Sequence, residues 1–335
     1  MTARPVAVVG GGVAGLSLGY ALGLRGVPVV VFERGRIGAQ GASSGPAALL
    51  NPYRGRSARA HPDDLAGLDA FWRRDRALRG RGLDPGAERS GVLRVAPDRR
   101  RARAWSRHQE ARWLDPPDVP APYRAPHGAL LAADGGWVRP RMLLAALRAA
   151  SVEHGAEVRE GVRVLRLEPA ADGIRLVTSA GTAAVDRVVL CVGADASPDL
   201  PLPPLSRVAG DIVEVSTGRL APPPRLPLGG SVYAAFVDGH GFVGGSHRDP
   251  DVPDPQAPLR LLERLDATLP GIGAEPGRSL WSGVRAVGDT PRPLVSDSVP
   301  RVTFFGALSG RGFLIAALMA ERLAGTLAER RAREG

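Results

Sequence analysis

The sequence has no lysine, and its 335 residues include a single cysteine. Because one cysteine cannot form an internal disulfide, we expect a core-stabilised fold in a reducing compartment such as the cytoplasm. No run of about 18 uninterrupted apolar residues is present, which argues against a membrane span. His, Cys and acidic residues nowhere show metal-ligand spacing, so we expect no metal.

Positive charge comes from arginine alone, and it is unevenly distributed. The chain has 44 arginines against 34 acidic residues, a net charge of +10. Residues 54–112 hold 16 of these arginines and only 8 acidic residues. This segment could meet an anionic partner such as tRNA, although a solvated helix face is the commoner cause of such a pattern. The abundance of arginine and proline also fits a GC-rich coding bias, so RNA binding stays the weaker alternative.

A glycine-rich turn lies between two apolar runs at the start of the chain. The run at 6–9 leads into Gly10, Gly12 and Gly15, and a second run at 29–32 ends at Glu33. This spacing is typical of a dinucleotide site: Gly10 permits a tight turn, Gly12 lets the backbone approach a pyrophosphate, and Gly15 lets a helix pack on the strand. Glu33 is expected to accept hydrogen bonds from the ribose hydroxyls, which argues against NADP. The alternative is a glycine-punctuated turn that binds nothing.

Strand-like and helix-like segments alternate along most of the chain. We expect helices at 14–25, 142–151 and from Phe313, and a largely helical stretch over 65–114. We expect strands at 158–167, 174–179, 188–192 and 302–305. The strand at 188–192 ends in Gly193, as expected where a strand brings its backbone to the cofactor. Short runs at 211–215, 233–237 and 241–244, separated by Pro-rich segments, indicate an antiparallel sheet.

Five separated motifs carry a family resemblance. They are Val8–Gly15 with Glu33-Arg34, Gly41–Ser44, Gly135–Pro140, Gly283–Arg285 and Gly310–Phe313. In this order they resemble the D-amino-acid-oxidase-type (DAO) FAD-dependent oxidoreductases, nearly end to end. Within the family the chain is similar to glycine oxidase. Through Asn51-Pro52 and Gly244–Asp249 it is also similar to the oxidoreductase half of the bifunctional enzyme that makes methylaminomethyl-thiouridine in tRNA.

The resemblance implies an α/β fold: a Rossmann-like, glutathione-reductase-like FAD-binding domain with an inserted substrate domain of mixed or antiparallel sheet. We expect residues 1–80, 135–200 and 281–335 to form the FAD domain, and 81–134 and 201–280 the substrate domain. It implies non-covalent FAD, because no Cys lies near Arg285 and no His lies in 41–46. The cofactor residues it implies are Gly10, Gly12, Val13, Ala14, Gly15, Glu33, Arg34, Ser43, Ser44, Leu165, Gly193, Gly310, Arg311, Gly312 and Phe313.

The resemblance also implies how a substrate binds. Arg285 is expected to clamp a carboxylate, since a guanidinium matches that planar anion bidentately, and Tyr233 to hydrogen-bond the same group. The alternatives are a surface arginine and a core tyrosine. No catalytic side chain is required for hydride transfer to flavin N5.

These residues lead to one main hypothesis and two alternatives. The main hypothesis is oxidation of the C–N bond of an amino acid or N-substituted glycine. The alternatives are removal of a carboxymethyl group from a tRNA wobble uridine, and a non-catalytic flavin-binding subunit. Because the chain has no lysine, it lacks the group with which some relatives activate oxygen, so oxygen is expected to react slowly.

Overall fold

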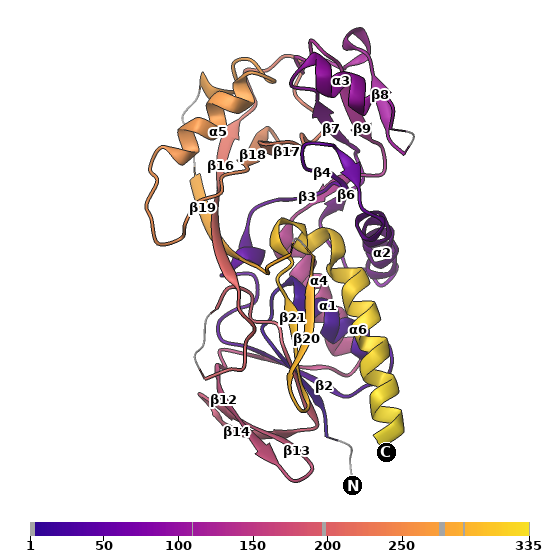
Figure 1. Cartoon of the computed structure of the whole chain (residues 1–335), viewed down its shortest axis with the longest axis vertical. Helices are drawn as coiled ribbons and strands as arrows, with labels where there is room; N and C mark the ends of the chain where they lie inside the picture. The colour runs from indigo at the N-terminus through magenta and orange to yellow at the C-terminus, as the bar shows by residue number, and fades with distance from the viewer. Residues whose placement is uncertain (1–3, 109, 196–198, 275–278, 291, 335) are drawn as a thin grey trace.

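The computed structural model describes residues 4–108, 110–195, 199–274, 279–290 and 292–334. One end of the molecule, at the bottom of Figure 1, is built on a six-stranded sheet of order β11-β2-β1-β15-β21-β20. Its strands are β1 (Val6–Val9), β2 (Val29–Glu33), β11 (Glu157–Glu160), β15 (Arg187–Leu190), β20 (Leu294–Val299) and β21 (Val302–Gly306). Neighbouring strands are parallel except for β20, which is antiparallel to β21.

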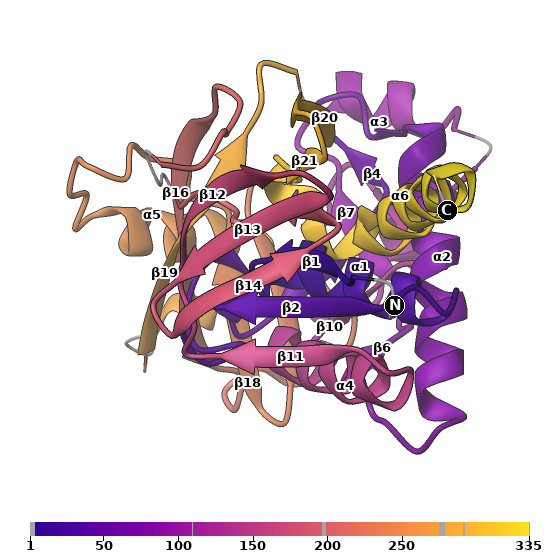
Figure 2. The same cartoon turned by 90° about the horizontal axis from the view of Figure 1, so that it is seen from below.

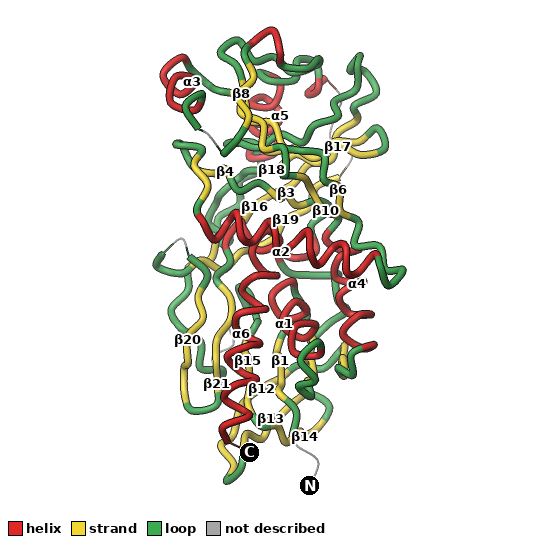
Figure 3. The backbone as a smooth tube through the Cα atoms, turned by 90° about the vertical axis from the view of Figure 1, so that its right-hand side faces the viewer, coloured by secondary structure: helices red, strands yellow, loops and turns green. Residues whose placement is uncertain are grey.

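Alternation along the central strands gives this sheet two buried faces. Val6 and Val8 belong to the core beneath the helices, whereas Ala7 and Val9 face the opposite core. The helices α1 (Val13–Gly23), α4 (Pro140–Glu153) and α6 (Gly312–Glu334) lie on the first face, and α2 (Pro62–Arg79) crosses α6 (Figure 3). The second face is covered by a three-stranded antiparallel sheet, β12 (Val164–Ala170), β13 (Gly173–Thr178) and β14 (Gly181–Val185) (Figure 2).

The other end of the molecule is built on antiparallel strands. The order β17-β18-β16-β19 joins β16 (Ser206–Ser216), β17 (Tyr233–Val237), β18 (His240–Gly244) and β19 (Ser279–Val287). Helix α5 (Ala257–Asp266) packs on this sheet through Leu261 and Leu265. The long strands β16 and β19 reach from this end towards the parallel sheet (Figure 1).

Smaller strands complete this end. A three-stranded sheet of β7 (Val92–Val95), β9 (Ala129–Ala132) and β8 (Arg112–Leu114) meets the chain before β17 at the Leu93–Leu228 bridge. Strands β3 (Ala48–Leu50), β10 (Gly136–Val138) and β6 (Ala87–Glu88) form another sheet. The remaining elements are β4 (Tyr53–Arg54), β5 (Arg59–Ala60) and α3 (Arg99–Trp105).

The fold class expected from the sequence is confirmed, but two local predictions are wrong. Residues 65–114 are not largely helical, because α2 ends at Arg79 and strands β6, β7 and β8 follow. Arg and Ala favour helix, yet strand β7 places the side chains of Val92 and Leu93 in two different cores, and this burial outweighs local propensity. The expected strand at 158–167 is two strands in different sheets, β11 and β12, separated by a turn at Gly161, which has φ +73°.

The proposed domain limits stay a prediction, and one of them falls inside an element. The limit at residue 281 divides β19, which pairs with β16 from Ser279 to Val287. All of β19 therefore lies in the antiparallel sheet. Within the described residues, no helix combines the length and the apolar content that a membrane span requires.

Candidate active site

The turn after β1 has no room for side chains at two of its glycines. Gly10 has φ +112°, and a Cβ there would lie 2.4 Å from the carbonyl oxygen of Cys191. A Cβ on Gly15 would lie 1.9 Å from the carbonyl oxygen of Gly10. Glycine is therefore required at both positions for strand, turn and helix to pack this closely.

The N-terminus of α1 opens at the carboxyl end of β1, where the strand order diverges to β2 on one side and β15 on the other. Gly12 caps the helix without a side-chain hydrogen bond, and the first turn has no acidic residue. The backbone N–H of Val13 donates to Ser43 Oγ at 3.1 Å. Free N–H groups and the helix dipole at such a divergence suit a pyrophosphate.

Polar groups at or after the ends of two strands, β2 and β15, surround this turn. Glu33 ends β2; its Oε2 accepts from the N–H of Gly11 at 2.7 Å and its Oε1 from the N–H of Gly35 at 3.0 Å. Each carboxylate oxygen keeps a further lone pair with which to accept a ribose hydroxyl. Arg34 forms an ion pair with Asp195, which follows β15, and Gly193 next to it has φ +64°.

The loop 306–312 reaches the same turn from near the other end of the chain. Ala307 and Ser309 both have φ +52°, a left-handed conformation that costs free energy for non-glycine residues. Helix α6 begins at Gly312, where a Cβ would lie 3.3 Å from Val13 Cγ1. The Arg311 side chain turns to α2, where its Nη1 lies 3.0 Å from an Asp64 carboxylate oxygen.

Val13 is thus the meeting point of the three motifs expected to hold the cofactor, since Ser43 contacts its N–H and Gly312 faces its side chain. Ala14 is buried in α1, and Phe313 packs on the core formed by α1, α2 and α6. The two helix N-termini and the glycine backbones suit a long dinucleotide cofactor with its pyrophosphate at α1. The residues present fit FAD.

One residue expected to bind the cofactor lies elsewhere, and the single cysteine lies in the core. Leu165 is in β12, with its side chain 38% exposed on the sheet that covers the parallel sheet, and stays a prediction. Its neighbour Val164 is the buried residue at this position. Cys191 is buried at the end of β15, and burial raises the pKa of its thiol, which suits an apolar core residue rather than a nucleophile.

The substrate residues share one face of the antiparallel sheet. Directly paired residues in antiparallel strands lie on the same face. One row across the four strands is Tyr233, Gly244, Ile212 and Trp281. Gly210 precedes Ile212 by two residues in β16 and pairs with Gly283. Val208, two residues earlier again, pairs with Arg285.

Glycines leave the space that the large side chains on this face of the sheet occupy. A Cβ on Gly244 would lie 2.4 Å from the Tyr233 hydroxyl, and one on Gly283 would lie 2.2 Å from the Trp281 ring. Trp281 Nε1 also donates to Ser44 Oγ at 3.1 Å, which joins β19 to the 41–44 turn. The tyrosine therefore depends on a glycine of the neighbouring strand β18, and the tryptophan on a glycine of its own strand β19.

Arg285 is held in the same way over Gly210. A Cβ on Gly210 would lie 2.6 Å from Arg285 Nη2, so only glycine leaves space for the guanidinium. Nη2 donates to the carbonyl oxygen of Ser246 at 3.2 Å and approaches that of Ala209 at 3.5 Å. The other terminal nitrogen, Nη1, lies 3.6 Å from where a Cβ on Gly310 would stand. Arg285 therefore connects the sheet face with the 306–312 loop.

Arg285 and Tyr233 each shift the pKa of the other. Burial lowers the pKa of Arg285, while Tyr233 and Asp211 counteract this. Burial raises the pKa of Tyr233, while Arg285 counteracts it. A cation and a neutral hydroxyl donor, both sheltered from water, make a suitable receptor for a carboxylate.

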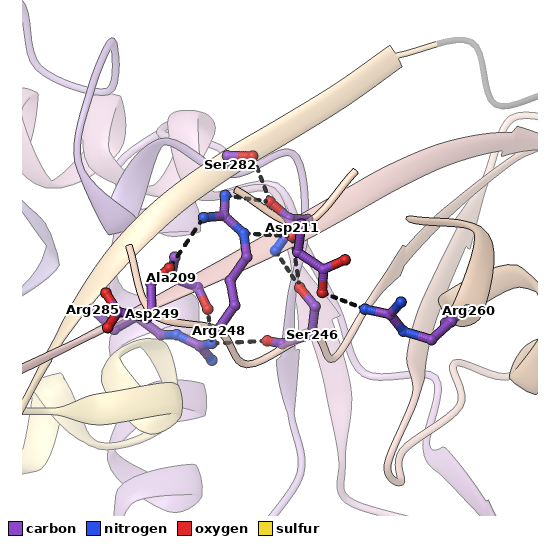
Figure 4. A network of polar contacts seen from close by, with 9 residues as sticks. Ala209, Asp211, Ser246, Arg248, Asp249, Arg260, Ser282 and Arg285 are labelled. Atoms are coloured by element: carbon purple, nitrogen blue, oxygen red, sulfur yellow. Dashed lines mark hydrogen bonds and ion pairs between the residues drawn. The ribbon is translucent and has the colours of Figure 1, made fainter. Parts of the chain in front are cut away.

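A buried carboxylate supports Arg285 from behind the sheet (Figure 4). Asp211 accepts hydrogen bonds from Ser246 Oγ at 3.0 Å and from Ser282 Oγ, and it forms an ion pair with Arg248 at 3.2 Å. Its side chain is 3% exposed. These bonds fix the 245–248 segment, whose Ser246 carbonyl holds Arg285.

Sequence reasoning missed Trp281, Gly210 and the Asp211 network. A signal for Trp281 was present, because Trp281, Gly283 and Arg285 are spaced two apart and a strand places them on one face. Gly210 and Asp211 carry no comparable signal. Their roles depend on the register between β16 and β19, which the sequence does not show.

A parallel sheet with a glycine-rich turn lies beside an antiparallel sheet that presents an arginine, and this arrangement is that of a flavin-dependent oxidoreductase. The model of the family described as FAD dependent oxidoreductase (DAO) matches residues 5–326. The chain belongs to this family, and FAD is its cofactor.

Relatives of this chain in sequence include proteins named for the modification of tRNA. The chain is 32% identical over 325 residues to the tRNA 5-methylaminomethyl-2-thiouridine biosynthesis bifunctional protein of Maricaulis maris, covering 96% of this chain and 52% of that protein. It is 30% identical to the protein of that name from Paraburkholderia phytofirmans, covering 96% and 51%. The chain therefore spans about half the length of these relatives.

Solved structures of amino-acid oxidising enzymes share the fold. Glycine oxidase from Geobacillus kaustophilus superposes with a TM-score of 0.84 at 25% identity, covering 98% of this chain and 95% of that one. Iminodiacetate oxidase from Chelativorans superposes with a TM-score of 0.78 at 22% identity, covering 96% and 95%. At that identity the second likeness shows the fold alone.

Proposed function

We propose that the protein oxidises the C–N bond of an N-substituted glycine or a small amino acid. The observation that carries this proposal is the Arg285 guanidinium, held over Gly210 with Nη1 directed to the 306–312 loop. A carboxylate bound there places the adjacent carbon of the substrate beside the segment expected to meet the flavin. The glycine oxidase likeness supports this choice of substrate class.

The protein groups bind and orient the substrate. Arg285 neutralises the carboxylate, and the Tyr233 hydroxyl donates a hydrogen bond to it, so the reacting Cα–H is fixed at one distance and angle. Because the site is half-buried, these charge-assisted bonds are stronger than they would be in water.

The substrate loses a hydride and a proton. FAD, when bound, supplies the acceptor for the hydride. As the Cα–H bond breaks, the nitrogen lone pair forms the C=N bond and the nitrogen releases its proton to solvent. Water then adds to the imine carbon, which gives a 2-oxo acid and an amine. An amine that binds neutral requires no protein base, and we propose no catalytic side chain.

An anaerobic absorbance experiment tests this function. The purified protein is mixed without oxygen with glycine, sarcosine, proline, iminodiacetate and D-amino acids in turn. We expect at least one N-substituted glycine to bleach the flavin absorbance. If every amine fails while dithionite bleaches it, a small amine substrate is ruled out and the proposal is wrong.

A second candidate substrate is a tRNA wobble uridine that carries a carboxymethylaminomethyl group, itself an N-substituted glycine. The sequence relatives favour it, and α3 supports it with exposed Arg99, Arg100 and Arg103. Binding to phosphates would weaken steeply with salt. Labelled tRNA is titrated at low and moderate salt, and tRNA bearing this group is tested for flavin reduction. Absence of binding at low salt removes this candidate.

A further inference from the structure

A second arginine shares the site with Arg285. Arg54 ends β4, and its Nη2 lies 3.3 Å from the position that a Cβ on Gly310 would occupy. Arg285 Nη1 lies 3.6 Å from the same point. Two guanidinium groups from different parts of the fold therefore flank one point above the loop expected to meet the flavin.

The positive charge of Arg54 is not balanced locally. Within the described residues, its guanidinium has no hydrogen bond or ion pair. Of the charges acting on it there, only that of Asp64 is negative, and Asp64 bonds to Arg311 Nη1 at 3.0 Å. Burial lowers the pKa of Arg54, as do the neighbouring Arg311 and Arg285. Like charges gathered away from water are costly, and an anion bound between them relieves that cost.

Hydrogen bonds from another arginine fix the backbone on both sides of Arg54. The carbonyl oxygens on either side of it, of Tyr53 and Gly55, both accept hydrogen bonds from Arg94, the first at 2.7 Å. The Arg94 guanidinium in turn lies 4.8 Å from the centre of the Trp105 ring. Arg94 thus serves as a structural support, and Arg54 is the arginine directed to the site. A fixed binding group loses little entropy when a ligand arrives.

We propose that Arg54 binds a second carboxylate of the substrate, so that the enzyme prefers amino dicarboxylates of the iminodiacetate class. This inference rests on the proposed function, in which Arg285 binds the first carboxylate. In iminodiacetate the two carboxyl carbons are four bonds apart, about 5 Å in an extended chain. A ligand of this size reaches both guanidinium groups, with its secondary amine and reacting carbon between them.

The geometry favours a small dianion over a tRNA phosphate. Arg54 Nη2 and Arg285 Nη1 approach the same point from different parts of the fold, so a ligand with two negative charges a few bonds apart can place one charge at each guanidinium. In a modified uridine the nearest phosphate is separated from the carboxylate by the base and the ribose. A preference for tRNA is therefore an outcome that would contradict the dicarboxylate assignment.

The first test uses the wild-type holoprotein and matched ligands. Anaerobic flavin reduction is titrated with iminodiacetate and with sarcosine, which lacks the second carboxylate. We expect iminodiacetate to half-saturate reduction at a concentration at least about 10-fold lower. Glutarate, in which a methylene replaces the amine, is expected to compete with either substrate, whereas butyrate is at least about 10-fold weaker. Equal half-saturation by both amines, or equal competition, overturns the proposal.

The second test uses Arg54→Gln, with Arg56→Gln as the matched control, since Arg56 is exposed two residues away. Arg54→Gln is expected to reduce the ratio of iminodiacetate to sarcosine affinity by about 30-fold, and Arg54→Lys is expected to restore part of it. Arg56→Gln keeps the wild-type ratio. A parallel loss for both substrates assigns Arg54 to the cofactor instead and contradicts the proposal. If Arg54→Gln does not fold, the glutarate and butyrate comparison still decides.

The outcomes separate this inference from the proposed function. Failure of every amine to reduce the flavin removes the proposed function. Reduction by sarcosine without a preference for iminodiacetate leaves that function intact and removes only the role of Arg54.

Discussion

The two halves of the site both depend on glycine, but for different reasons. At the cofactor end, Gly10 and Gly15 leave space for backbone: the atoms that a Cβ would meet are carbonyl oxygens of Cys191 and Gly10. At the substrate end, Gly210 and Gly283 leave space for side chains: the atoms are those of Arg285 and Trp281. The first kind of glycine shapes the chain, and the second positions another residue.

This difference determines how each half tolerates change. Backbone cannot move aside, so an added methyl group at the cofactor end must disrupt the turn. A side chain can rotate, so an added methyl group at the substrate end moves Arg285 and leaves the fold intact. We therefore expect loss of cofactor in the first case and loss of substrate affinity in the second.

The largest effect is expected from Gly15→Ala. Its Cβ would lie 1.9 Å from the Gly10 carbonyl oxygen, so we expect the variant to lose about 3 kcal/mol of stability and to purify without FAD. Thermal unfolding and flavin absorbance measure both. Gly325→Ala is the control: its Cβ meets nothing within 4 Å in α6, and we expect a gain of about 0.5–1 kcal/mol. Wild-type FAD content in Gly15→Ala would remove the distinction between the two halves.

Arg285→Met is expected to have the next largest effect. Two charge-assisted hydrogen bonds to a carboxylate contribute about 3 kcal/mol, so substrate affinity should fall about 150-fold while FAD stays bound. Steady-state kinetics and flavin absorbance report the two separately. Arg207→Met, an exposed arginine near the start of β16 on the face opposite Arg285, is the control and should behave as wild type. Unchanged affinity in Arg285→Met would show that the carboxylate binds elsewhere.

A smaller effect is expected from Gly210→Ala, which tests the substrate end most directly. The new Cβ would lie 2.6 Å from Arg285 Nη2 and displace the guanidinium, so KM should rise about 10-fold while thermal stability changes little. Gly218→Ala, just beyond β16, has ordinary contacts and should leave KM unchanged. A loss of FAD in Gly210→Ala would show that both halves respond alike.

The smallest effect is a dependence on alkaline pH. Burial raises the pKa of Tyr233 above its ordinary value of 10.0. The folded state therefore keeps this proton, and the stability it contributes is complete below pH 10 and lost as pH rises through the raised pKa. Urea unfolding across this range should show a weaker decline for Tyr233→Phe than for wild type. Identical declines would mean that Tyr233 is accessible to water.

The cofactor half was predictable because the residues that shape it lie close together in the sequence. Gly10, Gly15 and Glu33 act through turns and strand ends close to them in sequence, so spacing alone indicated the turn. The fold class was implied by the resemblance of the five motifs to the DAO family. The helical prediction over 65–114 failed because burial of Val92 and Leu93 in a sheet is a tertiary effect.

The substrate half was predictable only in part. Arg285 and Tyr233 were proposed by resemblance, and the structure places them on one sheet face. Gly210 acquires its role from pairing with Gly283, and Arg54 from its approach to Gly310, across segments far apart in the chain. Spacing within a segment carries no information about such pairs.

The contact between Val13 and Gly312 also has a consequence for biosynthesis. These residues stand near opposite ends of the sequence, yet their motifs form one cofactor site. During translation β1 and α1 emerge long before β21 and α6, so the parallel sheet has an open edge and the site is incomplete until α6 has been made. Flavin capture therefore follows the synthesis of α6, and a shortage of flavin would leave the separated segments of the site exposed to aggregation.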